Sequence, residues 1–85
     1  MSKKDKLIKR LLSEPKDFTF EEAETLLNYL AFYKDNRGKT SGSRVAFVSD
    51  KTSAKIILHK PHPRRELLSY QIKELIRFLK QENLI

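Results

Sequence analysis

With 85 residues, the chain is long enough for one domain with a modest hydrophobic core and too short for two. It has no cysteine, which excludes disulfides and thiolate metal sites, and no apolar run near the ~20 residues that a membrane helix requires. The formal net charge is +7, and residues 32–65 alone carry nine basic and two acidic side chains. We therefore expect a cytoplasmic protein that is bound to no membrane and has a phosphate-binding face.

The first predicted element is a short amphipathic helix over residues 3–13. Leu7, Ile8, Leu11 and Leu12 recur at helical spacing, and Pro15 ends the segment. A second helix is expected to begin a few residues later, at Thr19.

A capping box predicts where that second helix starts. Thr19 and Glu22 have the three-residue spacing at which each side chain caps the backbone of the other. The apolar stripe that follows predicts a helix to about Ala31.

Strands follow in the basic middle of the chain. Residues 32–35 are aromatic and short, 36–42 contain both glycines of the chain, and 44–48 and 54–59 have strand-like apolar patterns separated by a polar turn. Pro61 and Pro63 end the third strand. In the middle strand, Phe47 is interpreted as a core residue, whereas the role of Tyr33 in the first strand stays open.

A last helix is expected over about residues 70–82, with Ser69 as its N-cap. The predicted fold class is α+β, with a three-stranded antiparallel sheet and helices packed on one of its faces. The residues expected to form one core are Phe20, Leu27, Leu30, Phe47, Ile56, Leu58, Ile72, Leu75, Ile76 and Leu79.

From about Phe18 to Ile85 the order of these motifs resembles the HicA family of bacterial toxins. The shared positions are Leu26-Leu27, Ala31-Phe32, Gly42-Ser43 with Phe47, Pro61-His62-Pro63 and Glu66-Leu67. The resemblance implies an α-β-β-β-α domain similar to double-stranded-RNA-binding domains over residues 17–85, with residues 1–16 as an N-terminal helical extension. It also implies the toxin component of a type II toxin-antitoxin system, an endoribonuclease that cleaves mRNA, with a HicB-like antitoxin protein as partner.

The resemblance breaks at the catalytic position. The family motif is Gly-Ser-His, and the matching residues here are Gly42, Ser43 and Arg44. A metal-independent ribonuclease needs a base and an acid, and a guanidinium can only stabilise charge on the phosphate. His62, which the family often carries between two prolines, or His59 would have to compensate for the missing histidine.

The residues expected to contact RNA are Arg37, Lys39, Gly42, Ser43, Arg44, Lys60, Arg64 and Arg65. The alternative is that these basic residues only form a solvated rim on the surface and bind no ligand. Because His59 and His62 supply only half of a metal site, we expect no metal and no cofactor.

Three functions stay open at this point. The first is a HicA-like toxin with impaired or altered cleavage. The second is a non-catalytic relative that binds structured RNA, and the third is an interaction module whose basic face meets DNA or an acidic protein. The sequence does not predict the RNA target or the oligomeric state.

Overall fold

The computed structural model describes residues 2–35 and 44–85, and within them it has the α+β fold expected from the sequence. Its elements are α1 (Lys3–Leu12), α2 (Phe20–Tyr29), β1 (Phe32–Lys34), β2 (Arg44–Ser49), β3 (Lys55–His59) and α3 (Ser69–Gln81). The three strands form one antiparallel sheet in the order β1-β2-β3.

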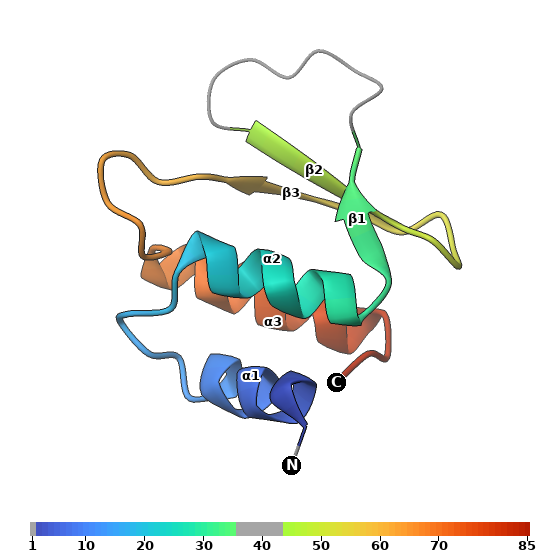
Figure 1. Cartoon of the computed structure of the whole chain (residues 1–85), viewed down its shortest axis with the longest axis horizontal. Coiled ribbons are helices and arrows are strands. Elements are labelled where there is room, and N and C mark those ends of the chain that lie inside the picture. Colours follow the sequence, from blue (N-terminus) through green and yellow to red (C-terminus); the bar gives the residue numbers. More distant parts are fainter. Residues whose placement is uncertain (1, 36–43) are drawn as a thin grey trace.

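The elements form layers (Figure 1). Helices α2 and α3 lie side by side against one face of the sheet, and α1 packs on this helix pair on the side away from the sheet. The predicted packing of helices on one sheet face is therefore confirmed. None of the described helices covers the other face, which we call the open face.

Alternation along the strands sends every second side chain into the core. Phe47 pairs with Ile56 and Val45 pairs with Leu58 across β2 and β3, and all four pack in or against the hydrophobic cluster. The intervening residues of the same strands therefore point to the open face.

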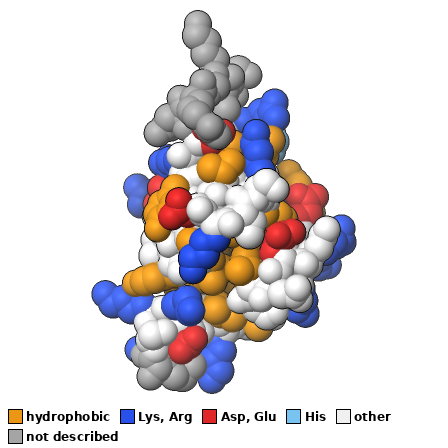
Figure 2. Space-filling model, turned by 90° about the vertical axis from the view of Figure 1, so that its right-hand side faces the viewer, with side chains coloured by type: hydrophobic (Ala, Val, Ile, Leu, Met, Phe, Trp, Pro, Cys, Tyr) orange, Lys and Arg blue, Asp and Glu red, His pale blue; other side chains and the backbone are white. Residues whose placement is uncertain are grey.

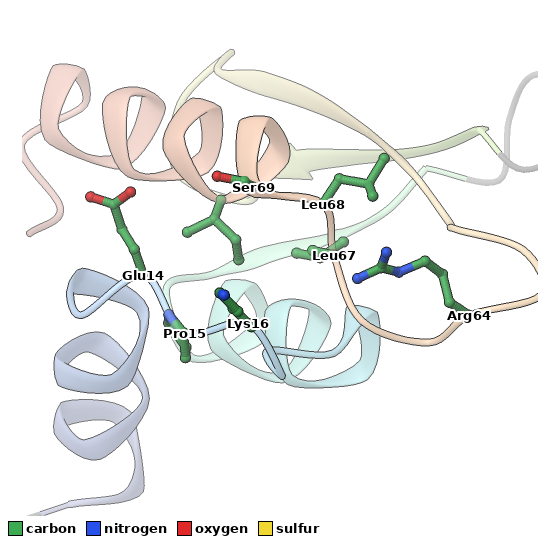
Figure 3. Close-up of a pocket in the computed structure, with 8 residues that line it drawn as sticks. Glu14, Pro15, Lys16, Arg64, Leu67, Leu68 and Ser69 are labelled. Carbon is green, nitrogen blue, oxygen red and sulfur yellow. The ribbon is translucent and has the colours of Figure 1, made fainter.

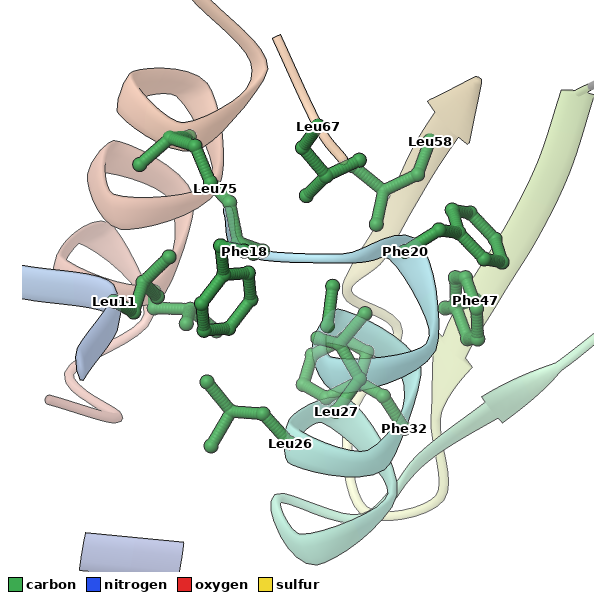
Figure 4. Close-up of a cluster of buried hydrophobic side chains, with 13 residues drawn as sticks. Leu11, Phe18, Phe20, Leu26, Leu27, Phe32, Phe47, Leu58, Leu67 and Leu75 are labelled. Carbon is green, nitrogen blue, oxygen red and sulfur yellow. The ribbon is translucent and has the colours of Figure 1, made fainter. Parts of the chain in front are cut away.

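The core extends from the sheet through the layer of α2 and α3 to α1 (Figure 4). Seven of the ten residues expected there are buried, and Leu30, Ile56 and Ile76 pack against them while partly exposed. The sequence prediction omitted six residues of the buried hydrophobic cluster: Leu11, Phe18, Ala23, Leu26, Phe32 and Leu67.

Phe18 and Leu67 are buried because two loops pair with each other. The Leu67 N–H donates to the Phe18 carbonyl at 2.8 Å, and the Phe20 N–H donates to the Arg65 carbonyl at 3.0 Å. This short bridge joins the segment before α2 to the connector between β3 and α3, which comprises residues 60–68. It ties the chain that follows the last strand to the helix layer.

Helix α1 belongs to the same core. Leu11 is fully buried, and the Arg10 guanidinium donates to both carboxylate oxygens of Glu22, at 2.7 and 3.2 Å. The same guanidinium also contacts Asp17 at 3.1 Å and lies 5.7 Å from the centroid of the Phe18 ring. The division of the chain into an N-terminal extension, residues 1–16, and a domain, residues 17–85, stays a prediction. Helix α1, which lies in the first of these segments, packs against α2 and α3.

The capping box at α2 is confirmed. The Glu22 N–H donates to Thr19 Oγ1, and the Thr19 N–H donates to Glu22 Oε1, both at 3.1 Å. At α3 the N-cap is Leu68, one residue before the predicted Ser69. The reason is Gln71, whose Oε1 accepts from the Leu68 N–H at 2.8 Å and so fixes the start of the helix one residue earlier.

Candidate nucleic-acid interface

Arg44 and His59, which are fifteen positions apart in the sequence, are paired across β2 and β3. Both are exposed, and both belong to the strand positions that point to the open face. Directly opposite residues of an antiparallel pair have Cβ atoms about 4.5–5.5 Å apart, which lets the two side chains approach the same phosphate. The fold therefore brings together one predicted charge-stabilising residue and one predicted acid or base.

A buried amide holds the end of β3 in place next to this pair. Gln71 is 4% exposed, and its Nε2 donates to the His59 carbonyl at 2.8 Å while its Oε1 caps α3 through Leu68. The His59 backbone is thus fixed to the helix layer, and its side chain is left on the sheet surface. Sequence reasoning did not assign Gln71 a role, because a polar residue in the first helical turn is usually solvated.

The other predicted residues that are described lie in the connector after β3. His62, Arg64 and Arg65 are exposed, and Arg64 Nε donates to the Glu66 carbonyl at 3.1 Å. Lys60 turns toward the helix layer, with its Nζ 5.9 Å from the centroid of the Phe20 ring. These residues border the Arg44–His59 pair in sequence but are not paired with it in the sheet.

Four predicted RNA-binding residues lie outside the described residues. They are Arg37, Lys39, Gly42 and Ser43. Their predicted roles stay predictions, and the site described here is built without them.

Charge alone does not single out this site. The view in Figure 2 shows Lys and Arg side chains around the outline of the molecule, with Asp and Glu side chains among them. Some of the basic residues already have an acidic partner. Arg10 forms an ion pair with Glu22, and Lys34 Nζ lies 3.2 Å from a carboxylate oxygen of Glu24. Arg44, in contrast, has no ion pair within residues 2–35 and 44–85.

A cleft of about 340 Å³ opens beside Arg64, between the α1–α2 linker and the start of α3 (Figure 3). Glu14, Lys16 and Arg64 line it together with apolar side chains such as Leu67 and Leu68. Arg44 and His59 are not among its lining residues, so the cleft is separate from the sheet pair. Its mixed charges and apolar floor do not indicate one class of ligand.

Two further findings concern metals and membranes. Within the described parts of the chain, no group of three or more His, Cys, Asp or Glu side chains is placed to hold a metal ion. None of the helices in these parts is long and apolar enough to cross a bilayer.

Comparisons of this chain with family models, with curated proteins and with solved structures gave no match. The similarity to the HicA family and to double-stranded-RNA-binding domains therefore rests on the sequence motifs alone.

The sequence left open the roles of two residues of the open face: Tyr33, which could stack on a base or belong to the core, and Lys55, which could contact the RNA backbone or lie in a solvated rim. Tyr33, on β1, has half of its side chain exposed, and Lys55, on β3, is also exposed. The alternation of Phe32, Tyr33 and Lys34 contains the signal, because burial of Phe32 forces its neighbour to the other face. The sequence did not say which of the two aromatic rings would be the buried one.

Proposed function

We propose that the protein is an RNA-binding protein of the HicA toxin type, the toxin component of a type II toxin-antitoxin system with a HicB-like antitoxin as its partner. The observation that supports RNA binding best is the exposed Arg44–His59 pair on the open face. The Arg44 guanidinium has no carboxylate partner among residues 2–35 and 44–85, so it is available to bind a phosphate through two parallel hydrogen bonds. An imidazole directly beside it adds a second nitrogen donor toward the same anion.

Cleavage of the bound RNA would proceed by attack of a ribose 2′-hydroxyl on the adjacent phosphate: the 2′-oxygen–phosphorus bond forms as the bond from phosphorus to the 5′-oxygen of the next nucleotide breaks. The 2′-hydroxyl loses its proton to a base, the departing 5′-oxygen gains one from an acid, and a 2′,3′-cyclic phosphate remains. Arg44 stays protonated, so it serves to neutralise charge on the phosphorus centre and not to accept the 2′-hydroxyl proton. Of the two histidines, His59 is the better candidate for proton transfer, because it is the cross-strand partner of Arg44 whereas His62 follows in the connector. We propose that cleavage by the natural protein is weak or absent.

The alternative function is a non-catalytic module with the same basic face, which binds RNA or an acidic protein. The Arg44 guanidinium, which has no ion pair among the residues that the structure describes, is as compatible with this module as with a toxin. The two functions differ in whether RNA is cut, and the antitoxin partner is tested by co-purification with the product of a neighbouring gene.

RNA binding is tested by fluorescence anisotropy with a labelled single-stranded RNA and a labelled RNA duplex over 50–300 mM salt. We expect the affinity to fall steeply with salt, and we expect Arg44→Ala to weaken binding and to reduce the slope of log affinity against log salt by about one. Lys4→Ala is the matched control, because it removes one charge from α1, which lies away from the sheet. Absence of binding at low salt, or equal loss in both variants, would overturn the proposed interface.

A further inference from the structure

The open face carries more than the Arg44–His59 pair. Three cross-strand rows follow one another along it: Tyr33 with Val48 and Lys55, then Ala46 with Ile57, then Arg44 with His59. Tyr33 is 50% exposed and Ile57 is 38% exposed, although both are large apolar side chains. The face is therefore an apolar strip with polar groups at its two ends.

The length of this strip follows from strand geometry. Val48 and Arg44 are four residues apart on β2, which places the first and third rows about 13 Å from each other. Ala46 lies between them and is 7% exposed, so the larger neighbouring side chains stand above it. The result is a surface with a small residue at its centre and an aromatic ring at one side.

Both ends of the strip are basic. Lys55 ends the first row and Arg44 begins the third, and no strand residue on this face, among those described, is acidic. Asp35, the residue after β1, continues the register opposite Ala46, to whose carbonyl its backbone N–H donates at 2.9 Å. Alternation therefore places this acid beside the middle row, between the two basic ends. A second copy of the chain docked face to face would bring positive side chains into the same buried region. The charges instead complement an anion that also has flat apolar parts.

Single-stranded RNA has this combination, because its unpaired bases are free to stack while its phosphates carry the charge. In a duplex the bases are stacked inside, and only phosphates and 2′-hydroxyls would reach the strip. We infer that the open face binds single-stranded RNA, with an unpaired base stacked on the Tyr33 ring and with phosphates held by Lys55 and Arg44. This inference rests on the proposed RNA-binding function. It adds that the RNA is single-stranded and that Tyr33 is the residue that distinguishes a single strand from a duplex.

The first test compares Tyr33→Ala with the wild type on a labelled ten-nucleotide oligouridine and on a blunt RNA duplex of the same length, at one salt concentration. We expect the variant to bind the single strand about tenfold more weakly and the duplex equally well, because stacking on one aromatic ring is lost. Tyr33→Phe keeps the ring and is expected to bind as the wild type does. Tyr70→Ala is the matched control, because Tyr70 is 56% exposed on α3, outside the sheet.

The second test uses the absence of tryptophan from the chain. The Tyr33→Trp variant reports from this position alone, and its fluorescence should be quenched by oligouridine and not by the duplex, whereas Tyr70→Trp should respond to neither. Equal affinity of Tyr33→Ala and wild type for the single strand would overturn the inference while leaving RNA binding intact. Equal loss on single strand and duplex would also overturn it, and a dimer that Tyr33→Ala dissociates would assign the face to a second copy. If the wild type binds no RNA, the proposed function fails and the inference fails with it.

Discussion

The two faces of the sheet differ although the same strands make both. On the covered face Phe47 and Leu58 are almost completely buried beneath α2 and α3, and on the open face Ile57 and Arg44 are exposed. Successive residues of one strand thus belong alternately to the core and to the surface. A substitution on one face should change stability, and a substitution one residue away should change binding, which makes the comparison testable residue by residue.

The largest expected effect is on the open face and concerns catalysis. Arg44→His restores the Gly-Ser-His motif opposite His59, and general acid–base catalysis contributes roughly 10²–10⁴-fold in rate. We expect the variant to cleave RNA faster than the natural protein by a factor in this range, measured with a labelled RNA in the presence of a chelator. Adding His59→Ala should abolish the gain, and adding His62→Ala should reduce it less.

Two results would contradict the proposal that Arg44 replaces the catalytic histidine. Robust cleavage by the natural sequence would mean that a histidine already performs the chemistry beside Arg44. No gain in Arg44→His, with RNA binding intact, would mean that the pair is built for binding alone.

The next effect compares neighbours on β3. Leu58→Ala removes a side chain that is 4% exposed and should lower the free energy of unfolding by about 2–5 kcal/mol. Ile57→Ala, which removes a side chain that is 38% exposed, should cost less than about 1.5 kcal/mol. Urea denaturation followed by circular dichroism measures both, and equal losses in the two variants would contradict the assignment of the two faces.

The smallest effect lies in the helix layer and depends on pH. The hydrogen bond from Arg10, together with the Thr19 backbone N–H, holds the pKa of Glu22 below its usual range. A carboxyl whose folded-state pKa is lowered stabilises the fold above its unfolded pKa, and this contribution is lost as the pH falls through the folded value. Glu22→Gln should therefore be less stable at pH 7, by less than about 1 kcal/mol because both partners are about one third exposed.

The difference between Glu22→Gln and the wild type should shrink as the pH falls from about 5 to 3. Denaturation curves at pH 7, 5, 4 and 3 measure it, and Glu74→Gln, on the exposed side of α3, controls for the loss of one charge. A difference that stays constant over this range would show that the Arg10–Glu22 pair does not act through the charge on Glu22.

Local signals in the sequence predicted the elements well. The capping box at Thr19, the apolar spacing of α3 and the alternation of faces along β2 each depend on residues close together in the chain, and all three are observed. The end of α2 shows the limit of such signals. The helix stops at Tyr29, and Ala31 has a φ of 68° before β1 begins. A left-handed conformation costs an alanine about 1–2 kcal/mol and is therefore uncommon for this residue type. For that reason, Ala31 in the sequence does not indicate that the chain turns there.

The candidate site depended on information that local patterns lack. The pairing of Arg44 with His59 follows from the register of β2 and β3, and a shift of β3 by one residue would turn the His59 side chain to the covered face, away from Arg44. The buried pairing of Phe18 with Leu67 likewise joins two loops that are far apart in the chain. Most of the basic residues of the candidate site could be predicted from the sequence. Which of them lie on the same surface follows only from the pairing of the strands.

The most direct test of the central claim is a titration of the ¹⁵N-labelled protein with single-stranded oligouridine, followed by amide chemical shifts. We expect the largest shifts from Tyr33 and from the strand residues 44–48 and 55–59, whose alternate side chains form the open face, with little change in α1. Shifts concentrated in residues 3–12, or no shifts at low salt, would contradict the claim that this sheet face binds RNA.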